Sequence, residues 1–308
     1  MLRSSGKIIE EDEMGTFYVL FSAAMWAFHG NIAGFLFDAR GVSPTLLVAV
    51  RLLGTGLILS CYLLFREGKN PLALWGQRDQ LLPLILYTFV GVSTMQLAFY
   101  QCIAASNAPT ATLIQYMGLF LVIAFAAHRE GQLPPLGTYL ALALSVTGLI
   151  LLVTGGDLGA LKISPAALKW GLIAALGYAS FNIGPLLLPR PFRALELVAA
   201  SMLVAGISVA LLGRPPLPPS WDARTLLAMA YSIFGGTLFP FLLYTVGQRM
   251  VGPQRAVILA LSESVISALL SIFLFGIPLG PMDLMSMAMI LAGILMVQLQ
   301  GHGLRGRG

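Results

Sequence analysis

Three ionisable side chains, His29, Arg51 and Glu263, interrupt long apolar stretches of this 308-residue chain. Ionisable residues inside a hydrophobic segment are costly to bury, and they usually mark the path of a substrate, an ion or a proton. A guanidinium binds carboxylates in a bidentate manner, an imidazole titrates near neutral pH, and a buried carboxyl can exchange a proton or bind an amine. The three residue types together predict a site for a small zwitterionic or amphipathic molecule.

Each of these residues also has a purely structural interpretation. Glu263 could be permanently paired with Arg51 or with backbone amides, and Arg51 could form another salt bridge or extend to the outer surface. His29 could be a hydrogen-bonded contact between helices. If the functional interpretation holds, Glu263 and His29 are also the two candidates for proton coupling.

A second group of aromatic and amide side chains lies well inside apolar stretches, away from the interface positions where aromatic residues are usual. It consists of Trp26, Asn31, Gln96, Tyr100, Gln115, Tyr116, Tyr178, Asn182 and Tyr244. These residues predict a cavity that stacks on an apolar or aromatic part of the substrate and hydrogen bonds to its polar head. The alternative is that they are polar contacts between packed membrane helices.

The composition shows that such residues lie in a membrane protein. Hydrophobic residues make up 57% of the chain and charged residues 10%, against about 25% charged residues in a soluble domain. This chain cannot cover a water-facing surface, so soluble enzymes and nucleic-acid-binding proteins are excluded in spite of the net charge of +5. The sequence has no phosphate-binding Gly-rich loop, no His or Cys cluster and no Ser/His/Asp pattern. We therefore expect neither catalysis nor a metal or other cofactor.

Ten stretches reach the length of about 20 apolar residues that a membrane-spanning helix needs. They are residues 16–37, 44–65, 82–104, 108–127, 136–154, 166–188, 193–212, 225–247, 253–275 and 280–300. The breaks between them carry turn residues, such as Gly41 with Pro44, Pro189 with Pro191, and Gly276 with Pro278. The sequence therefore predicts an all-α polytopic membrane protein with ten transmembrane helices.

The ten predicted spans form two copies of one unit. Tyr100 precedes Pro109 by nine residues, as Tyr244 precedes Pro253, and Asn31-Ile32 corresponds to Asn182-Ile183. We predict one five-helix repeat at residues 16–154 and another at 166–300, with terminal tails at 1–15 and 301–308. Because five is odd, the second copy enters the membrane from the opposite side. The repeats are therefore inverted, which permits alternating access to a site near the midplane.

Lysine and arginine positions predict the orientation, since these residues concentrate on the cytoplasmic side. The side that holds both termini carries Arg3, Lys7, Arg66, Lys69, Arg78, Arg129, Arg190, Arg193, Arg249, Arg255, Arg305 and Arg307. The opposite side carries only Arg40, Lys162, Lys169, Arg214 and Arg224. This bias places both tails in the cytoplasm. At ~1.5 Å per helical residue, the three buried ionisable residues then fall within about 5 Å of one depth near the midplane.

Several short motifs follow one another along the chain. They are Gly41-Val42-Ser43-Pro44 before Val50-Arg51-Leu52, Tyr100 through Pro109 before Gln115-Tyr116-Met117-Gly118, Tyr244 before Val251-Gly252-Pro253, and Leu261-Ser262-Glu263-Ser264. These motifs resemble those of EamA-type transporters in the drug/metabolite transporter superfamily. The resemblance covers nearly the whole chain. It implies an inner-membrane carrier with a central cavity lined by both repeats, in which Arg51 and Glu263 match frequent residues of spans two and nine. The family often has a proline where this chain has Leu119 and Ser264, so broken helices are not implied there.

These observations predict a secondary transporter that acts as an exporter of small metabolites, with amino acids as the first candidates. Aromatic amino-acid exporters of the YddG type share the implied architecture. A proton-coupled exporter of cationic drugs, with Glu263 as the shared site, is one alternative. A membrane sensor that binds a ligand without moving it is the other. One chain supplies both halves of the pathway, so we expect a monomer to be sufficient.

Overall fold

The structure is a computed structural model that describes residues 2–106, 108–160, 163–189, 192–218, 220–275 and 280–305. Every regular element in these ranges is a helix, which confirms the all-α fold. Within these ranges, ten helices are long and apolar enough to cross a membrane. They are Glu10–Asp38, Pro44–Glu67, Arg78–Ala105, Thr110–Glu130, Leu136–Thr154, Pro165–Leu187, Ala194–Gly213, Ala223–Val251, Pro253–Leu270 and Pro281–Leu299. Each overlaps one predicted span, so the prediction of ten spans is confirmed.

The chain ends differ in detail from the sequence prediction. The first helix, α1, runs from Leu2 to Asp38, so the segment predicted as an N-terminal tail is helical and continuous with the first span. The last helix, α14 (Pro281–Arg305), continues past the predicted start of the C-terminal tail. The predicted break at Gly276 with Pro278 lies outside the described residues, as do Pro191 and residues 306–308.

The chain divides into two compact units that do not coincide with the two sequence repeats. Unit 1 comprises residues 1–27, 119–162 and 243–308, and unit 2 comprises residues 28–118 and 163–242. The chain passes from one unit to the other inside α1, between Ala27 and Phe28, and inside α11 (Phe239–Val251), between Leu242 and Leu243. Each unit is therefore built from segments of both repeats.

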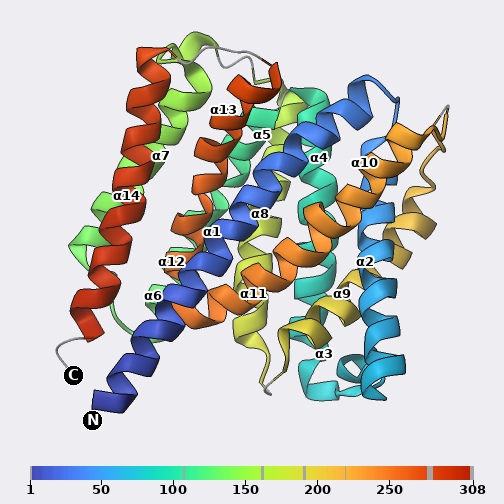
Figure 1. The fold of residues 1–308 in the computed structure, drawn as a ribbon, viewed down its shortest axis with the longest axis horizontal. Helices are drawn as coiled ribbons and strands as arrows, with labels where there is room; N and C mark the ends of the chain where they lie inside the picture. The colour runs from blue at the N-terminus through green and yellow to red at the C-terminus, as the bar shows by residue number, and fades with distance from the viewer. Residues whose placement is uncertain are drawn as a thin grey trace. The chain divides into compact units, whose positions relative to one another are not determined.

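In unit 2, α2 (Pro44–Glu67) packs side by side with α9 (Ala194–Gly213), as Figure 1 shows. A Cβ on Gly56 would lie 2.4 Å from the Cα of Leu203, and a Cβ on Gly206 would lie 2.5 Å from the backbone nitrogen of Leu53. The two backbones thus touch at two reciprocal glycines. Small residues permit this approach between membrane helices, where packing replaces the hydrophobic effect as the source of association.

In unit 1, α7 (Leu136–Thr154) and α14 form the equivalent pair (Figure 1). A Cβ on Gly148 would lie 2.7 Å from the carbonyl oxygen of Ser286, and a Cβ on Gly293 would lie 2.1 Å from Ser145 Oγ. Spans two and seven, and spans five and ten, are therefore joined by the same device. Unit 1 also contains α6 (Gly118–Glu130), α12 (Pro253–Ala260) and α13 (Ser262–Phe275).

Four spans are interrupted at corresponding places in the two repeats. Span three contains a π-helix, η3 (Leu86–Thr94), between α3 (Leu81–Ile85) and α4 (Met95–Ala105), and follows the short helices η1 (Ala73–Gly76) and η2 (Arg78–Gln80). Span eight contains the π-helix η5 (Phe234–Leu238) between α10 (Ala223–Ile233) and α11. Span four breaks between α5 (Ala108–Gln115) and α6, and span nine breaks between α12 and α13. The last two breaks occur without the proline that the family often has.

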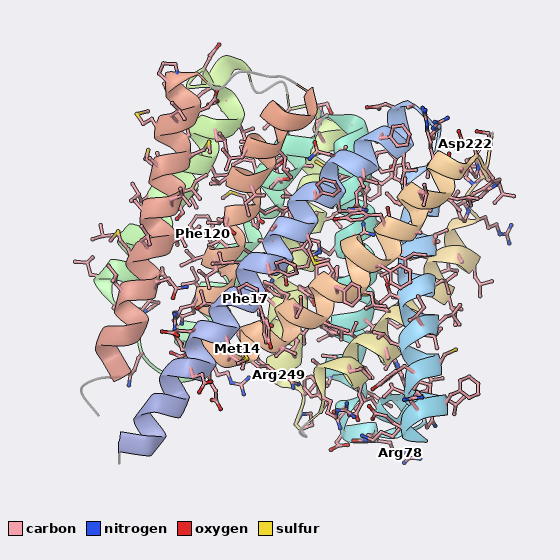
Figure 2. The ribbon with its side chains drawn as sticks, in the orientation of Figure 1. Met14, Phe17, Arg78, Phe120, Asp222 and Arg249 are labelled. Atoms are coloured by element: carbon pink, nitrogen blue, oxygen red, sulfur yellow. The ribbon has the colours of Figure 1, made fainter. Side chains whose placement is uncertain are left out.

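Local signals start the helices that matter for the site. The Ser43 side chain accepts a hydrogen bond from the Leu46 amide and caps α2, and Pro44 occupies its first turn. The side chain of Asp222 accepts from the Thr225 amide at 2.8 Å and caps α10 (Figure 2). Ser164 caps α8 (Pro165–Leu187) in the same way, and η4 (Leu158–Ala160) precedes it. These caps set where each span begins and therefore which residues lie deep inside it.

Candidate functional site

Arg51 lies in the second turn of α2 and is 3% exposed. Its Nε donates a hydrogen bond to Thr237 Oγ1 at 2.8 Å, its Nη2 donates to the carbonyl oxygen of Gly236 at 2.8 Å, and its Nη1 donates to Tyr100 Oη. Within the described part of the chain, all its acceptors are uncharged, so the guanidinium is neither salt-bridged nor extended to the surface. A buried cation without a neutralising partner is costly, and it favours an anion nearby.

The π-helix η5 presents two of these acceptors. Pro240 has no N–H, so it cannot supply the donor that the Gly236 carbonyl would use in an α-helix, and its ring crowds that carbonyl. Thr237 Oγ1 in turn donates to the carbonyl oxygen of Ser232 at 2.9 Å. The Gly-Gly-x-x-x-Pro stretch thus explains both the local departure from α geometry and the carbonyl that Arg51 contacts.

Tyr100 and His29 extend the network from α4 and α1. Tyr100 Oη lies 3.3 Å from His29 Nδ1, and both side chains are buried. Because Arg51 can only donate, Tyr100 Oη accepts from it. Either Tyr100 Oη or His29 Nδ1 is the donor in the contact between them, according to the imidazole tautomer. His29 Nε2 is buried and has no hydrogen-bond partner among the described residues. The His29 ring also rests on η5, since a Cβ on Gly236 would lie 2.3 Å from its Cδ2.

Gln96 and Gln115 add buried amide atoms in the same unit. Gln96 is 4% exposed, and neither its Oε1 nor its Nε2 has a hydrogen-bond partner among the described residues. It lies one helical turn before Tyr100 on α4, so the two side chains share a face. Gln115 Oε1, at the end of α5, is buried and unsatisfied as well. Unpaired buried amides are expensive, so these positions favour a polar ligand or water.

Three other residues predicted for the site form a second cluster in unit 2. The rings of Tyr116 and Tyr178 meet edge to face with centroids 5.5 Å apart. Asn182 is fully buried, and its Nδ2 donates to the carbonyl oxygen of Tyr178, one turn earlier in the same helix α8, at 2.8 Å. Tyr116 lies where span four breaks. Its position at an irregular backbone is what a site built from discontinuous helices requires.

Unit 1 carries the remaining predicted residues. Trp26 and Tyr244 contact each other, with ring centroids 5.3 Å apart. Glu263 is half-buried in the first turn of α13, directly after the break in span nine. A helix N-terminus favours a carboxylate there. Asn31 is half-buried on α1 in unit 2. The common depth of Glu263 with the unit 2 residues stays a prediction.

Sequence reasoning did not identify several residues that complete these groups. Thr237 and Gly236 hold Arg51, and Phe37 packs edge to face on Tyr100 with centroids 5.7 Å apart. The repeat register contains a usable signal for Thr237, because it precedes Tyr244 by the same seven residues that separate Ser93 from Tyr100. Phe37 carries no such signal.

The unit 2 network leaves both donors and acceptors for a ligand. Arg51 has five N–H groups and uses three, while the amide oxygens of Gln96 and Gln115 are buried without a partner among the described residues. The unused N–H groups of Arg51 suit a carboxylate, and the amide oxygens suit an ammonium group. Among the residues that the structure describes, no group of three or more His, Cys, Asp and Glu side chains could hold a metal ion.

Comparison with known proteins gives a consistent result. The model of the EamA-like transporter family matches residues 13–154 and again residues 165–299. The chain is 32% identical over 289 residues to the uncharacterized inner membrane transporter YicL of Salmonella typhimurium, covering 94% of this chain and 96% of that protein. It is 30% identical over 228 residues to an uncharacterized transporter of Archaeoglobus fulgidus, covering 71% and 77%. A solved crystal structure matches with a TM-score of 0.76 at 18% identity, covering 94% of this chain and 98% of that one, which supports the fold alone.

Proposed function

This chain belongs to the EamA-like transporter family, and from that premise we propose that it carries amino acids across the inner membrane, as an exporter. Membership makes it a membrane transporter and speaks against an enzyme. The double match of the family also agrees with an internal repeat. The inner-membrane location follows the name of the Salmonella relative. Cytoplasmic termini, domain limits at 16–154 and 166–300, and function as a monomer are part of the same proposal.

One observation carries the choice of substrate: Arg51 is buried and hydrogen bonded only to uncharged groups in the described part of the chain. The carboxylate of an amino acid would neutralise it and accept from the two N–H groups that Arg51 leaves unused. Gln96 and Gln115 offer amide oxygens to the substrate ammonium, and Glu263 offers a carboxylate. The aromatic residues Trp26, Tyr100, Tyr116, Tyr178 and Tyr244, with Asn31 and Asn182, would line the path of its side chain.

The direct test is uptake of labelled amino acids into proteoliposomes that contain the purified protein. We expect saturable uptake that is inhibited by other amino acids and not by amino-acid amides, which lack the carboxylate. Arg51→Gln should abolish it, whereas Arg66→Gln, which changes an exposed arginine of the same helix, should leave it unchanged. Absence of saturable flux for every amino acid would exclude this substrate class.

The same preparation separates the two alternatives. A proton-coupled exporter of cationic drugs would move organic cations along a pH gradient and lose that activity in Glu263→Gln. A sensor would show amino-acid binding by thermal shift with no flux at all. The amino-acid carrier predicts flux that survives in Arg66→Gln and disappears in Arg51→Gln, whichever direction the gradient drives it.

A further inference from the structure

The two π-helices are related by the internal repeat and share one side-chain device. Ser93 Oγ donates to the carbonyl oxygen of Thr88 at 3.1 Å, and Thr237 Oγ1 donates to that of Ser232 at 2.9 Å. In each case the hydroxyl reaches back five residues. The pairs stand at an offset of 144 residues, the same offset that relates Tyr100 to Tyr244. The π-helices are thus a duplicated feature and not a local accident.

The second copy has a charged clamp that the first copy lacks. Arg51 donates to both Thr237 and Gly236 in η5, at 2.8 Å each. In η3, a Cβ on Gly91 would instead lie 2.8 Å from the Cα of Phe181, so this turn packs against the backbone of α8. In the repeat register, Arg51 corresponds to a position near Met202, which offers no donor. Among the residues that the structure describes, only η5 is therefore held by hydrogen bonds from a cation.

The backbone of η5 depends on this clamp. The position equivalent to Pro240 in the first copy is Gln96, which has a backbone N–H. The missing N–H of Pro240 leaves the Gly236 carbonyl short of its α-helical donor, and inside a membrane no water replaces it. Arg51 supplies a donor to that carbonyl. The stability of η5 is thus tied to the position of one guanidinium.

We propose that Thr237 and Gly236 are positioning residues that hold the Arg51 guanidinium for the substrate, and that η5 is the segment that responds when the substrate binds. A carboxylate bound to the two unused N–H groups is a stronger acceptor than a hydroxyl or a carbonyl, so it weakens the guanidinium's bonds to Thr237 and Gly236. The π-helix then loses its clamp and repacks. Absorbing one extra residue into α geometry turns the following helix by about 100° and shifts it by about 1.5 Å.

The place of η5 in the chain gives this change a consequence. The chain leaves unit 2 for unit 1 between Leu242 and Leu243, four residues after η5 ends at Leu238. Rotation of α11 therefore passes along the covalent chain from the unit that holds Arg51 into the other unit. The reciprocal segment η3 packs against the backbone of α8 at Gly91 and serves as a passive counterpart. This inference rests on the proposed function in one respect, namely that the competing anion is the substrate carboxylate.

Hydrogen–deuterium exchange of the purified protein, read for residues 234–238 and 86–94, tests the clamp. Thr237→Val keeps the shape of the side chain and removes its hydroxyl, so exchange at 234–238 should rise about tenfold or more, the loss expected for a hydrogen bond to a charged group. Thr237→Ser should restore the slow exchange. Ser93→Ala is the matched control, and it should raise exchange at 86–94 only.

Transport kinetics test the positioning role. Thr237→Val should raise KM about tenfold with a smaller change in kcat, while Ser93→Ala should leave KM unchanged. Saturating amino acid should accelerate exchange at 234–238 in the wild type and not at 86–94. Equal KM effects in the two variants, or an η5 that exchanges as slowly in Thr237→Val as in the wild type, would overturn the proposal.

These outcomes also separate the inference from the proposed function. If Thr237→Val exposes 234–238 but no amino acid is transported, the substrate class is wrong and the clamp stands. If amino acids are transported and Thr237→Val changes neither exchange nor KM, the clamp is wrong and the substrate class stands.

Discussion

Replacing Asp12 with asparagine should destabilise the protein strongly, although this residue stands in an acidic run, Glu10 to Glu13, within the predicted N-terminal tail. Arg255 Nη1 and Nη2 donate to the two Asp12 carboxylate oxygens at 2.6 and 3.0 Å, and Nη2 also donates to Gln298 Oε1 at 2.7 Å. Gln298 Nε2 donates to Thr16 at 3.1 Å. This group joins α1, α12 and α14 within unit 1. The carboxylate is 4% exposed and the guanidinium 15% exposed.

Removing one partner of a buried ion pair costs about 3–5 kcal/mol, because the remaining charge is left uncompensated. Arg255 would keep Gln298 and some contact with solvent, so we expect the lower end, about 3 kcal/mol. At about 2 °C per kcal/mol for a chain of this size, the apparent Tm should fall by roughly 6 °C. Intrinsic tryptophan fluorescence during heating of the detergent-solubilised protein measures this shift.

The neighbouring residues provide matched controls. Glu11 and Glu13 flank Asp12 and are exposed, as are Met14 and Phe17 on the following turn (Figure 2). Glu11→Gln and Glu13→Gln should change Tm by little. The double variant Asp12→Asn with Arg255→Gln should be less destabilised than the sum of the single variants, since no charge is stranded. A Tm for Asp12→Asn that matches the two glutamate controls would refute the buried-pair reasoning.

Three further predictions concern close packing and pH. Gly236→Ala should displace the His29 ring, reduce the free energy of unfolding by about 1–3 kcal/mol and impair transport. Gly34→Ala, whose new Cβ would meet nothing within 4 Å, should change neither the Tm nor transport. Gly206→Ala should separate α9 from the backbone of α2 and reduce the free energy of unfolding by a similar amount, with Gly34→Ala again as the control. An unchanged Tm in Gly206→Ala would contradict the close contact between the two helices. The hydrogen bond from the Thr225 amide, with further bonds and charges nearby, lowers the pKa of Asp222. The Asp222 carboxylate therefore stabilises the folded protein fully above its pKa in the unfolded chain, and this contribution is lost as the pH falls through its lower pKa in the folded protein. The Tm of the wild type should exceed that of Asp222→Asn by a constant amount above about pH 5, and the difference should shrink below about pH 4. A pH-independent difference would rule this out.

Local sequence chemistry was sufficient for much of the fold. Apolar stretches of the right length predicted the ten spans, and their paired motifs predicted the repeat. Glycines such as Gly56 and Gly148 recur through the apolar spans, and the structure places them at points of close packing. Breaks in spans four and nine were not predicted, since no proline marks them.

In the candidate site, too, the sequence identified the ionisable residues, whereas their partners are known only from the structure. The cost of burying a charge in an apolar segment made Arg51, His29 and Glu263 stand out from single-residue chemistry. Which acceptors Arg51 reaches depends on Thr237 and Gly236, 185 or more residues away. Asp12 is one of four consecutive acidic residues in the predicted tail, and its ion pair with Arg255 distinguishes it from the other three.

Burial cost and helical period act along the chain, so the amino-acid sequence alone determines the membrane class, the spans and the duplicated plan. Hydrogen-bond partners are selected by distance in space, and any of several polar residues at similar depth satisfies the same sequence pattern. Tertiary structure therefore decides that Arg51 clamps a π-helix, that His29 Nε2 is buried without a partner among the described residues, and that an apparent tail residue holds three helices together.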